Sequence, residues 1–493
     1  MTTDPSGDTA GASVSDPTGA SLRNPPAHSF RGPFADGPPP EALAVDRPSL
    51  RAFGLAEARR MLVIAAVMTG CLIRALARWL LHPRRARLRE AAATGVVDAF
   101  CALGPTFVKL GQLMGSSPSI CPAPLSDAAR RCIRELGPVD VDLVRRAIEA
   151  DLGRPVDELF ASFEDRPLSA ASVAQVHGCV LPDGRQAVMK IQRPGIRSTM
   201  ISDLRIQWRM MRLLQRLSGF ARDANVTGAI EDLHEVTCNE LNFVLEAHRQ
   251  SRFRDRIWVF GDNTAVTAPE VYWNWCGPNV ICMERLFGVP IDDFDAVRRR
   301  NGDGKLSMRR GVKVWMEACL VHGPFHGDVH AGNIWILDDG RVAFLDFGIM
   351  GELTDDWKEA MRDFFETSAI DNDFTRVARS YKRVGAFPAD AGSDEDIGAS
   401  MQMVFGPMFD AGLGEVPMAS LLAEIIRTMG AWAGGAGTPK ELQLILKQLL
   451  YFERYSKEFA PDWPMFRDLY LMRNVFPEAV AARVAATGVT LPD

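Results

Sequence analysis

Residues 322–351 read HGPFHGDVHAGNIWILDDGRVAFLDFGIMG, and this stretch decides the fold. Two short apolar runs, IWIL and VAFL, flank the turn sequence DDG, which predicts two strands joined by a tight turn. Asp328 and Asn333 precede the first strand, and Asp346 follows the second. Phosphoryl transfer uses such groups in this order: a carboxylate that accepts a hydroxyl proton, then an amide and a second carboxylate that hold Mg²⁺. The stretch therefore predicts a phosphoryl-transfer site.

Three histidines in the same stretch offer a competing interpretation. His322, His326 and His330 are spaced four residues apart, as zinc ligands on a helix are. However, Gly-Pro at 323–324 interrupts a helix, and no glutamate occupies the catalytic position of a helical zinc motif. We therefore expect one or more of these histidines to brace the loop that carries Asp328.

Strand signals also lie upstream, where SAASVAQVHGCVL and RQAVMKIQRPG flank Pro-Asp-Gly and predict a β-hairpin. Lys190 lies within the apolar second arm. A lysine buried in a strand needs a carboxylate or a phosphate as its partner, because desolvation disfavours the charged form. Glu240 and Glu246, in the strongly helical segment 199–255, are available for this role. A lysine at a strand edge would instead be an ordinary surface residue.

Composition narrows the class of protein. The chain has 493 residues, 47% apolar and 24% charged, which suits two or three folded units. Its 56 Lys and Arg against 62 Asp and Glu give a net charge of −6, which argues against a dedicated nucleic-acid binder. Nine cysteines without a CxxC pair favour a reducing cytoplasmic location over a disulfide framework.

The N-terminal ninety residues form two contrasting segments. Residues 1–50 are rich in Pro, Gly, Ser and Thr, and predict a disordered tail that is neither a secretory signal nor a transit peptide. Residues 51–90 carry nine Arg and two Glu around the apolar run 61–73. Thirteen apolar residues fall short of the about 20 that span a bilayer, so we expect no spanning helix. The segment predicts either a basic amphipathic helix on an anionic membrane surface or a bundle helix.

The next segment, residues 91–165, is expected to be helical. Gly104-Pro105 ends one helix and begins another, and Lys109 and Gln112 share a face of the second.

These motifs occur in an order that resembles the UbiB/AarF (ADCK) atypical kinase-like family, from roughly residue 90 to residue 460. The matching segments are KLGQ at 109–112, SAASVAQVH at 169–177, AVMKIQRPG at 187–195, ELNFVLEA at 240–247, ICMERLFG at 281–288, HGDVHAGN at 326–333 and DFG at 346–348. Several positions depart from the family pattern: Ala174 stands where its loop has Gly, Ser169 where the loop has Ala, and Asn242 where its ExD motif has Asp. The Arg that follows the family's KxGQ segment is also absent.

The resemblance implies a role for each matched residue. Asp328, Lys190 and Glu246 would be catalytic, with Lys190 binding phosphates and Glu246 holding it, while Asn333 and Asp346 would bind Mg²⁺. The residues implied to contact the nucleotide are Ala170, Ala171, Ser172 and Val173 of the Ala-rich loop, Lys190, and Glu284 of the hinge. The residues implied to occlude the site are Lys109, Gln112 and Glu240.

The implied fold is α+β and two-lobed, like a protein kinase, with a small antiparallel sheet in the N-lobe, a helical C-lobe and an added N-terminal helical KxGQ element. The expected segments are the tail at 1–50, the basic helix at 51–90, the KxGQ element at 91–165, the N-lobe at 166–287, the C-lobe at 288–475 and a C-terminal tail at 476–493.

The implied function is phosphoryl transfer or hydrolysis with ATP (or ADP) and Mg²⁺, coupled to isoprenoid-quinone or lipid metabolism. The implied partners are a nucleotide, an isoprenoid lipid or quinone precursor and an anionic membrane surface, with no nucleic acid. The expected location is cytoplasmic, including the inner face of the cell membrane. Two alternatives stay open: a small-molecule kinase resembling aminoglycoside and choline phosphotransferases, and a nucleotide-gated lipid-binding pseudokinase scaffold.

Overall fold

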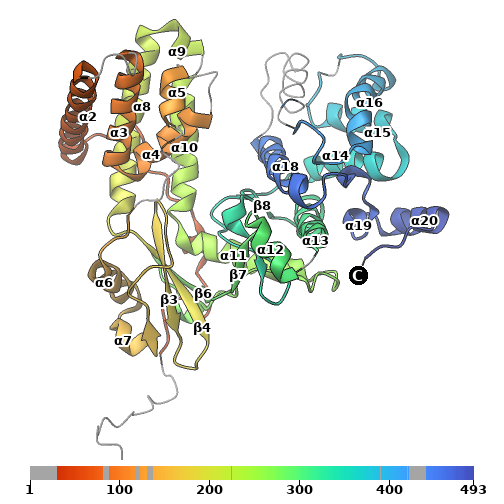
Figure 1. Ribbon diagram of the computed structural model, residues 1–493, viewed down its shortest axis with the longest axis horizontal. Coiled ribbons are helices and arrows are strands. Elements are labelled where there is room, and N and C mark those ends of the chain that lie inside the picture. The colour runs from red at the N-terminus through yellow and green to blue at the C-terminus, as the bar shows by residue number, and fades with distance from the viewer. Residues whose placement is uncertain are drawn as a thin grey trace, which may run out of the picture.

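The computed structural model describes the whole chain except residues 1–29, 82–87, 117–122, 130, 132–136, 224, 302, 389, 419, 421–439 and 493. Figure 1 shows a sheet with a helical bundle at one end and a second, mostly helical lobe beside it. The sheet and the bundle come from the N-terminal half of the chain, and the helical lobe from the C-terminal half. The architecture is therefore the two-lobed α+β fold that the sequence predicts.

The N-lobe contains a five-stranded antiparallel sheet in the order β1-β3-β4-β6, with β2 paired to β3. Its strands are β1 Ser162–Phe163, β2 Ser169–Ala170, β3 Ala174–Val180, β4 Gln186–Gln192 and β6 Val280–Glu284. Ala187, Met189 and Ile191 of β4 alternate along the strand and are fully buried, as a core-facing strand requires. The helices packed around the sheet are α6 Val141–Leu152, α7 Val156–Leu159 and α11 Phe243–Ile257.

A helical bundle extends from the sheet at the end opposite α7 (Figure 1). Its helices are α2 Leu55–Leu81, α3 Leu88–Leu103, α4 Pro105–Ser116, α5 Ala123–Ala129, α8 Ile196–Leu217, α9 Gly219–Asp223 and α10 Val226–Glu240. Ile64, Val97, Phe100, Phe107 and Ile206 form its core and join α2, α3, α4 and α8. The bundle thus combines the segment before the sheet with the long helices after β4.

The C-lobe is built on a large core that includes Trp315, Phe325, Phe344, Phe347 and Phe452. Its small sheets order as β5-β10-β9-β7 and β11-β8, from β5 Val266–Thr267, β7 Gly288–Pro290, β8 Phe325–His326, β9 Ile334–Leu337, β10 Val342–Phe344 and β11 Met350–Gly351. Its helices are α12 Phe294–Asn301, α13 Gly304–Glu317, α14 Asp355–Glu366, α15 Phe374–Arg383, α16 Asp394–Asp410, α18 Lys440–Phe459, α19 Leu469–Met472 and α20 Pro477–Thr487, with short turns η3 Ala318–His322, η4 Ala331–Asn333 and η5 Thr367–Asp371.

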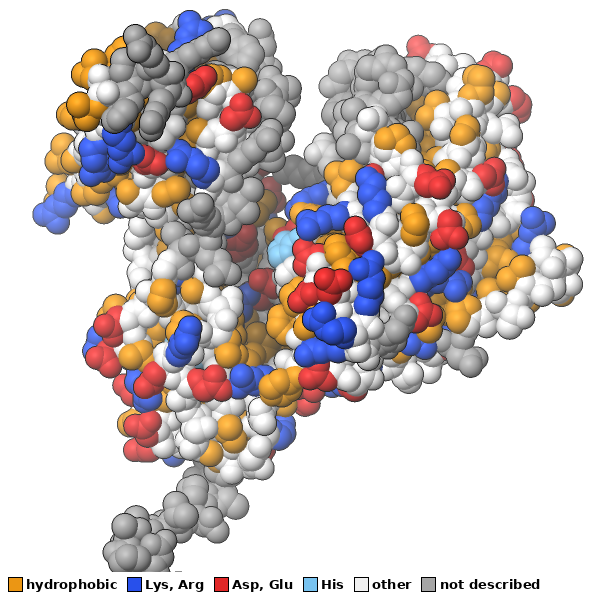
Figure 2. Space-filling view, viewed as in Figure 1, with side chains coloured by type: hydrophobic (Ala, Val, Ile, Leu, Met, Phe, Trp, Pro, Cys, Tyr) orange, Lys and Arg blue, Asp and Glu red, His pale blue; other side chains and the backbone are white. Residues whose placement is uncertain are grey.

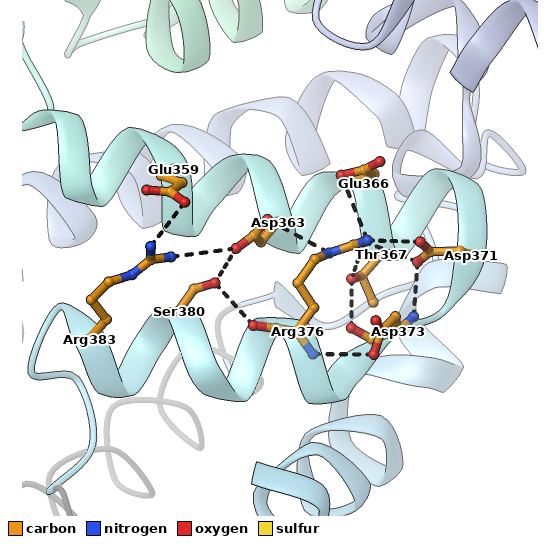
Figure 3. Close-up of polar contacts among 9 residues, drawn as sticks. All are labelled: Glu359, Asp363, Glu366, Thr367, Asp371, Asp373, Arg376, Ser380 and Arg383. Carbon is orange, nitrogen blue, oxygen red and sulfur yellow. Dashed lines mark hydrogen bonds and ion pairs between the residues drawn. The ribbon is translucent and has the colours of Figure 1, made fainter. Parts of the chain in front are cut away.

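Polar contacts hold α14 and α15 together through the η5 turn (Figure 3). Arg376 of α15 donates to Asp371 and Thr367 at 2.9 and 3.0 Å, and Arg383 donates to Glu359 of α14 at 3.0 Å. The core beneath these contacts is aromatic, so the cluster orients helices whose inner faces are already packed.

The predicted tail at 1–50 is wrong for residues 30–50, which are packed against the N-lobe. Phe34 is buried in the N-lobe core, and α1 Pro40–Leu43 lies beside α11. Asn242 donates to the carbonyls of Ala42 and Ala44, both at 3.1 Å. This segment is held by single apolar anchors and backbone hydrogen bonds, which leave no periodic signal in a sequence. Residues 1–29 lie outside the described residues.

The predicted tail at 476–493 is also wrong, because α20 occupies residues 477–487 and buries Val480 in the C-lobe core. Pro477 begins this helix and Gly488 ends it in the left-handed conformation, as capping rules favour.

The basic segment contains a longer helix than the 13-residue apolar run indicated. Helix α2 has 27 residues, and by length and composition it could cross a membrane. Only 17% of its apolar window is buried in the protein, through positions such as Ile64, Cys71 and Ala75. The expectation that no helix here reaches spanning length was therefore wrong, because Arg74 and Arg78 end the apolar run without ending the helix.

Candidate functional site

A cavity of about 110 Å³ lies in the hollow between the two lobes (Figure 2), and we call it the interlobe pocket. Its lining comprises Ala171, Ser172, Val173, Lys190, Glu240, Glu246, Asp328, His330, Asn333, Asp346, Gly348 and Ile349. The structure thus brings together the predicted lysine, both predicted glutamates and the Asp–Asn–Asp set from segments far apart in the chain.

Lys190 lies at the centre of β4, opposite Val176 of β3, and is 7% exposed. Its Nζ lies 2.5 Å from Oε1 of Glu246 and 3.4 Å from Oδ1 of Asp346. Burial would lower the pKa of the Lys190 ammonium, but the two carboxylates outweigh it and raise the pKa above its ordinary value. Lys190 is therefore a charged group held at a fixed point of the pocket.

Glu246 is placed by the first turn of α11. The side chain of Asn242 caps this helix by accepting a hydrogen bond from the N–H of Leu245 at 2.9 Å. Burial raises the pKa of Glu246 to about 7, and the charge of Lys190 opposes this shift. Asn242 does not line the pocket, so its departure from the family's Asp changes a helix cap and a contact with residues 42 and 44.

Asp346 follows β10 in a left-handed backbone conformation with φ of 57°. Side chains disfavour this region, although Asp tolerates it better than most, and such strain concentrates at functional sites. Partial desolvation between the lobes would raise the pKa of Asp346, but the charge of Lys190 and the N–H of Gly348 lower it below its ordinary value. The carboxylate is thus ionised, half exposed and turned into the pocket.

The loop that carries Asp328 is braced from within the C-lobe. The ring of His326 is fully buried, with Nε2 2.9 Å from the carbonyl of Leu345 and Nδ1 accepting from the N–H of Asp328 at 3.2 Å. The Asn333 amide donates to the Asp328 carbonyl at 2.9 Å. His326 therefore braces the loop, as predicted for one or more of the histidines, and the Asn333 amide ties the end of this loop back to Asp328.

Helix α18 contacts the same loop, which sequence reasoning missed. Gln448 is fully buried; it accepts from the N–H of Val329 at 2.8 Å and donates to the carbonyl of Gly327 at 2.7 Å. Lys447 donates to Oδ1 of Asp328 at 2.8 Å. A polar Lys-Gln pair inside the apolar run LILKQLLYF was the available signal, although it does not identify a partner.

The KLGQ helix α4 meets the pocket through Lys109, which pairs closely with Glu240 at the end of α10. Burial lowers the pKa of Lys109 to about 8, while Asp346 and the contact with Glu240 favour the charged form. Gln112 is exposed on the same helix and does not line the pocket.

Two predicted nucleotide-contacting residues lie away from the pocket lining. Ala170 belongs to β2, and the lining begins at the next residue, Ala171. Glu284 ends β6, and its carboxylate accepts from Arg254 at 3.2 Å and from the N–H of Glu270 at 3.2 Å. The hinge strand is present, but the Glu284 side chain points to this pair and not to the pocket.

The pocket offers oxygen ligands of the kind that Mg²⁺ prefers. The Asn333 NH₂ group is committed to the Asp328 carbonyl, which leaves its amide oxygen as the free ligand atom beside the carboxylate of Asp346. These residues therefore fit Mg²⁺ bound together with phosphate oxygens. Among the described residues, no three His, Cys, Asp or Glu side chains are grouped as a metal site, so the three histidines do not converge.

Comparison with known proteins gives concordant matches. The model of the ABC1 atypical kinase-like domain family matches residues 133–381. The uncharacterized protein Rv0647c of Mycobacterium tuberculosis is 31% identical, covering 84% of this chain and 83% of its own. The probable protein kinase UbiB of Azotobacter vinelandii is 30% identical, covering 82% and 75%. A chloroplastic aarF domain-containing protein kinase of Arabidopsis thaliana is 30% identical, covering 75% and 72%.

Proposed function

The chain belongs to the ABC1 atypical kinase-like family, and from this premise we propose that it binds ATP with Mg²⁺ in the interlobe pocket and transfers or hydrolyses the terminal phosphoryl group. One observation carries the proposal: Lys190 is held between Glu246 and Asp346, in a cavity that Asp328 and Asn333 also line. Phosphoryl transfer depends on positioning and on charge stabilisation more than on covalent chemistry, and this arrangement supplies both.

Each residue has a defined task in this proposal. Lys190 binds the phosphates, and Glu246 prevents its flexible side chain from leaving that position. Asp328 accepts the proton of the attacking hydroxyl as the new oxygen–phosphorus bond forms and the bond to ADP breaks. Asn333 and Asp346 would hold Mg²⁺, which when bound neutralises charge on the phosphates.

The acceptor proposed is an isoprenoid-quinone precursor or another lipid, handled at the inner face of the cell membrane. The apolar face of α2 supports a membrane contact: Leu62, Ile73, Leu80 and Leu81 are each more than half exposed. In Figure 2 hydrophobic side chains gather over α2 at the upper left of the molecule.

A second candidate is a nucleotide-gated lipid-binding scaffold with little turnover. The interlobe pocket, at about 110 Å³, is smaller than the about 300 Å³ at which small-molecule sites begin. The elements around it are also tied together, since Lys109 of the KLGQ helix pairs with Glu240 of its lining. ATP therefore binds only if the elements around the pocket move apart. In a scaffold protein, this movement on ATP binding would be the functional output, without turnover of the nucleotide.

The test is Mg-ATP binding by calorimetry and phosphate release, for the wild type and for Asp346→Asn. We expect the variant to lose measurable turnover and Mg-dependent nucleotide affinity, since a neutral amide replaces the carboxylate ligand. Asp339→Asn is the matched control, because Asp339 pairs with Arg341 in the turn between β9 and β10. Binding without turnover in the wild type would favour the scaffold, and unchanged binding and turnover in Asp346→Asn would contradict both candidates.

A further inference from the structure

A second cavity, of about 300 Å³, lies on the bundle and shares no lining residue with the interlobe pocket. It is lined by Arg51, Trp208, Arg209, Arg212, Leu213 and Arg216, and we call it the arginine pocket. Arg209, Arg212 and Arg216 recur on one face of α8, and Arg51 approaches from the loop before α2. Four arginines thus line one cavity, and no acidic residue lines it.

The charges of these arginines are not balanced within the described part of the chain. Arg209 donates to three backbone carbonyls, those of Leu50, Arg51 and Arg205, at 2.7 to 3.2 Å, and these carry no formal charge. Arg212 lies over the ring of Trp208, 5.1 Å from its centroid. None of the four arginines takes part in an ion pair in this part of the molecule, and the nearby Glu231 accepts from the indole N–H of Trp208.

Ordinary structural roles account for only part of this arrangement. The negative end of the α8 dipole favours Arg216 in the last turn, but it acts over that turn alone. It does not explain why Arg51, from another element, lines the same cavity as Arg209 and Arg212. Like charges at this spacing repel one another, so a bound anion would relieve the repulsion and stabilise the pocket. Arginine forks bind phosphate oxygens in pairs, which makes a phosphate group the matching ligand.

The surroundings of the pocket are apolar, and this decides which phosphate fits. Met210, Leu213, Leu214 and Leu217 are 52%, 56%, 43% and 77% exposed and follow the i, i+3, i+4, i+7 spacing of one helix face. Arg209 also stacks on Phe53, 45% exposed, in the loop that leads into α2. A stripe of exposed Leu and Met beside a row of Arg is the pattern of a helix at a membrane interface.

We propose that the arginine pocket binds the phosphate of an anionic phospholipid headgroup, with the apolar stripe of α8 against the acyl region. The proposal rests on the membrane contact in the proposed function and adds a defined site to it. A free phosphate would use the same arginines, but it would leave four large apolar side chains exposed to water. The phospholipid satisfies the charge and covers the stripe at the same time.

The experiment is sedimentation of the full chain with vesicles of phosphatidylcholine, alone or mixed with phosphatidylglycerol. We expect binding to the mixed vesicles, and a loss on the order of 20-fold in Arg212→Gln/Arg216→Gln, since each arginine near an anionic surface contributes about 5-fold. Arg146→Gln/Arg299→Gln, which removes the same charge from exposed positions elsewhere, is the matched control and should bind like the wild type.

A third variant distinguishes specific binding of the phosphate by arginine from general attraction by positive charge. Arg212→Lys/Arg216→Lys keeps the charge but loses the paired hydrogen bonds, and we expect it to bind several-fold more weakly than the wild type. Equal binding by the Lys and wild-type proteins, or by the Gln and wild-type proteins, would overturn the site. Saturable binding of inorganic phosphate without vesicle binding would overturn the lipid as its source.

ATP turnover in solution distinguishes this inference from the proposed function. Turnover should be unchanged in the Gln and Lys variants, because the two cavities share no residue. If the wild type turns over ATP but binds neither kind of vesicle, the lipid site and the membrane contact both fall while the phosphoryl-transfer proposal stands. If vesicle binding survives in the Gln variant, the membrane contact stands and the arginine pocket falls.

Discussion

The interlobe pocket and the arginine pocket are both proposed to bind a phosphate, but their charged residues are arranged in opposite ways. The interlobe pocket is lined by one lysine and four carboxylates, and its lysine is fixed by two of them. The arginine pocket is lined by four arginines and no carboxylate. An acidic pocket accepts phosphates only together with a metal cation, as a site for chemistry on Mg-ATP requires, whereas the arginine pocket attracts a bare anion.

The largest effect we expect concerns binding to anionic membranes and the arginines that follow α2 in the sequence. Replacing Arg84, Arg85 and Arg87 by Glu should weaken binding to anionic vesicles on the order of 100-fold, because each arginine near such a surface contributes roughly 1 kcal/mol. Wild-type binding should also fall as salt rises, and solution ATP affinity should be unchanged. These three residues lie outside the described residues, so the prediction rests on the sequence.

Comparison with the arginine-pocket variants then shows which arginines carry the membrane contact. Vesicle binding that is indifferent to salt and to these three substitutions would mean that the segment does not contact membrane. The membrane part of the proposal would then depend on α8 alone.

His322 shows the opposite case to Lys190, because burial acts on its imidazole without an acidic partner to offset it. Burial lowers the pKa of His322 to about 4, and the charges of Arg256 and Lys358 act in the same direction. Because the folded pKa lies below the unfolded value near 6.5, stability is fully present above pH 6.5 and is lost as the pH falls toward 4. We expect a loss of about 2 to 3 kcal/mol in the free energy of unfolding, after allowance for partial solvent access.

Urea unfolding of the wild type and of His322→Phe at pH 8, 6.5, 5 and 4 measures this loss. The variant should show a shallower decline, not a flat one, since burial also lowers the pKa of His177 and His326. Parallel curves for the two proteins would contradict the assignment.

A smaller effect is expected at the fixed lysine of the interlobe pocket. Lys190→Ala should lower ATP turnover by about 10-fold or more, because it removes the phosphate-binding charge and leaves Glu246 buried without its partner. Lys190→Arg tests whether charge alone suffices at this position. A Lys190→Ala protein that folds and turns over normally would mean that phosphates bind elsewhere. Arg212→Gln, in the other pocket, is the control and should leave turnover unchanged.

Local patterns in the sequence predicted the segments that build the interlobe pocket. Lys190, Glu246, Asp328, Asn333 and Asp346 stand in or beside elements with clear hairpin, helix or turn signals, and the structure brings all five to one cavity. Their catalytic and metal-binding roles stay predictions. The hinge prediction was less exact, because a strand signal places the backbone of Glu284 but not the side to which its carboxylate turns.

The contacts that the sequence did not reveal join residues far apart in the chain. Residues 42 and 44 bind Asn242 about two hundred positions away, and Gln448 binds the 327–329 loop from 119 and 121 positions away. Such contacts pair a side chain with a backbone group, so neither partner shows a residue type or spacing that identifies the other. The arginine pocket was missed because Arg51 lies 158 positions before Arg209 and reaches the cavity only through the packing of the chain around α2 on α8.

The smallest effect we expect tests whether α18 contributes to the reaction or only to packing. Lys447 is 44% exposed, and its ion pair with Asp328 faces the pocket, whereas Gln448 beside it holds the loop from the core. A partly exposed pair of this kind is worth about 0.2 to 1 kcal/mol, so Lys447→Met should lower kcat by about 5-fold at most. KM for ATP should stay the same, because Lys447 contacts Asp328 and not the residues assigned to the phosphates.

Lys457→Met, which breaks a pair with Glu453 on the same helix, controls for helix stability. A fall in Tm with kcat unchanged would assign Lys447 to packing, and a rise in KM alone would place it among the nucleotide-binding residues. A lower kcat at constant KM and Tm, restored by Lys447→Arg, would make it a positioning residue for Asp328, so that even the acidic pocket between the lobes depends on a lysine from a distant helix.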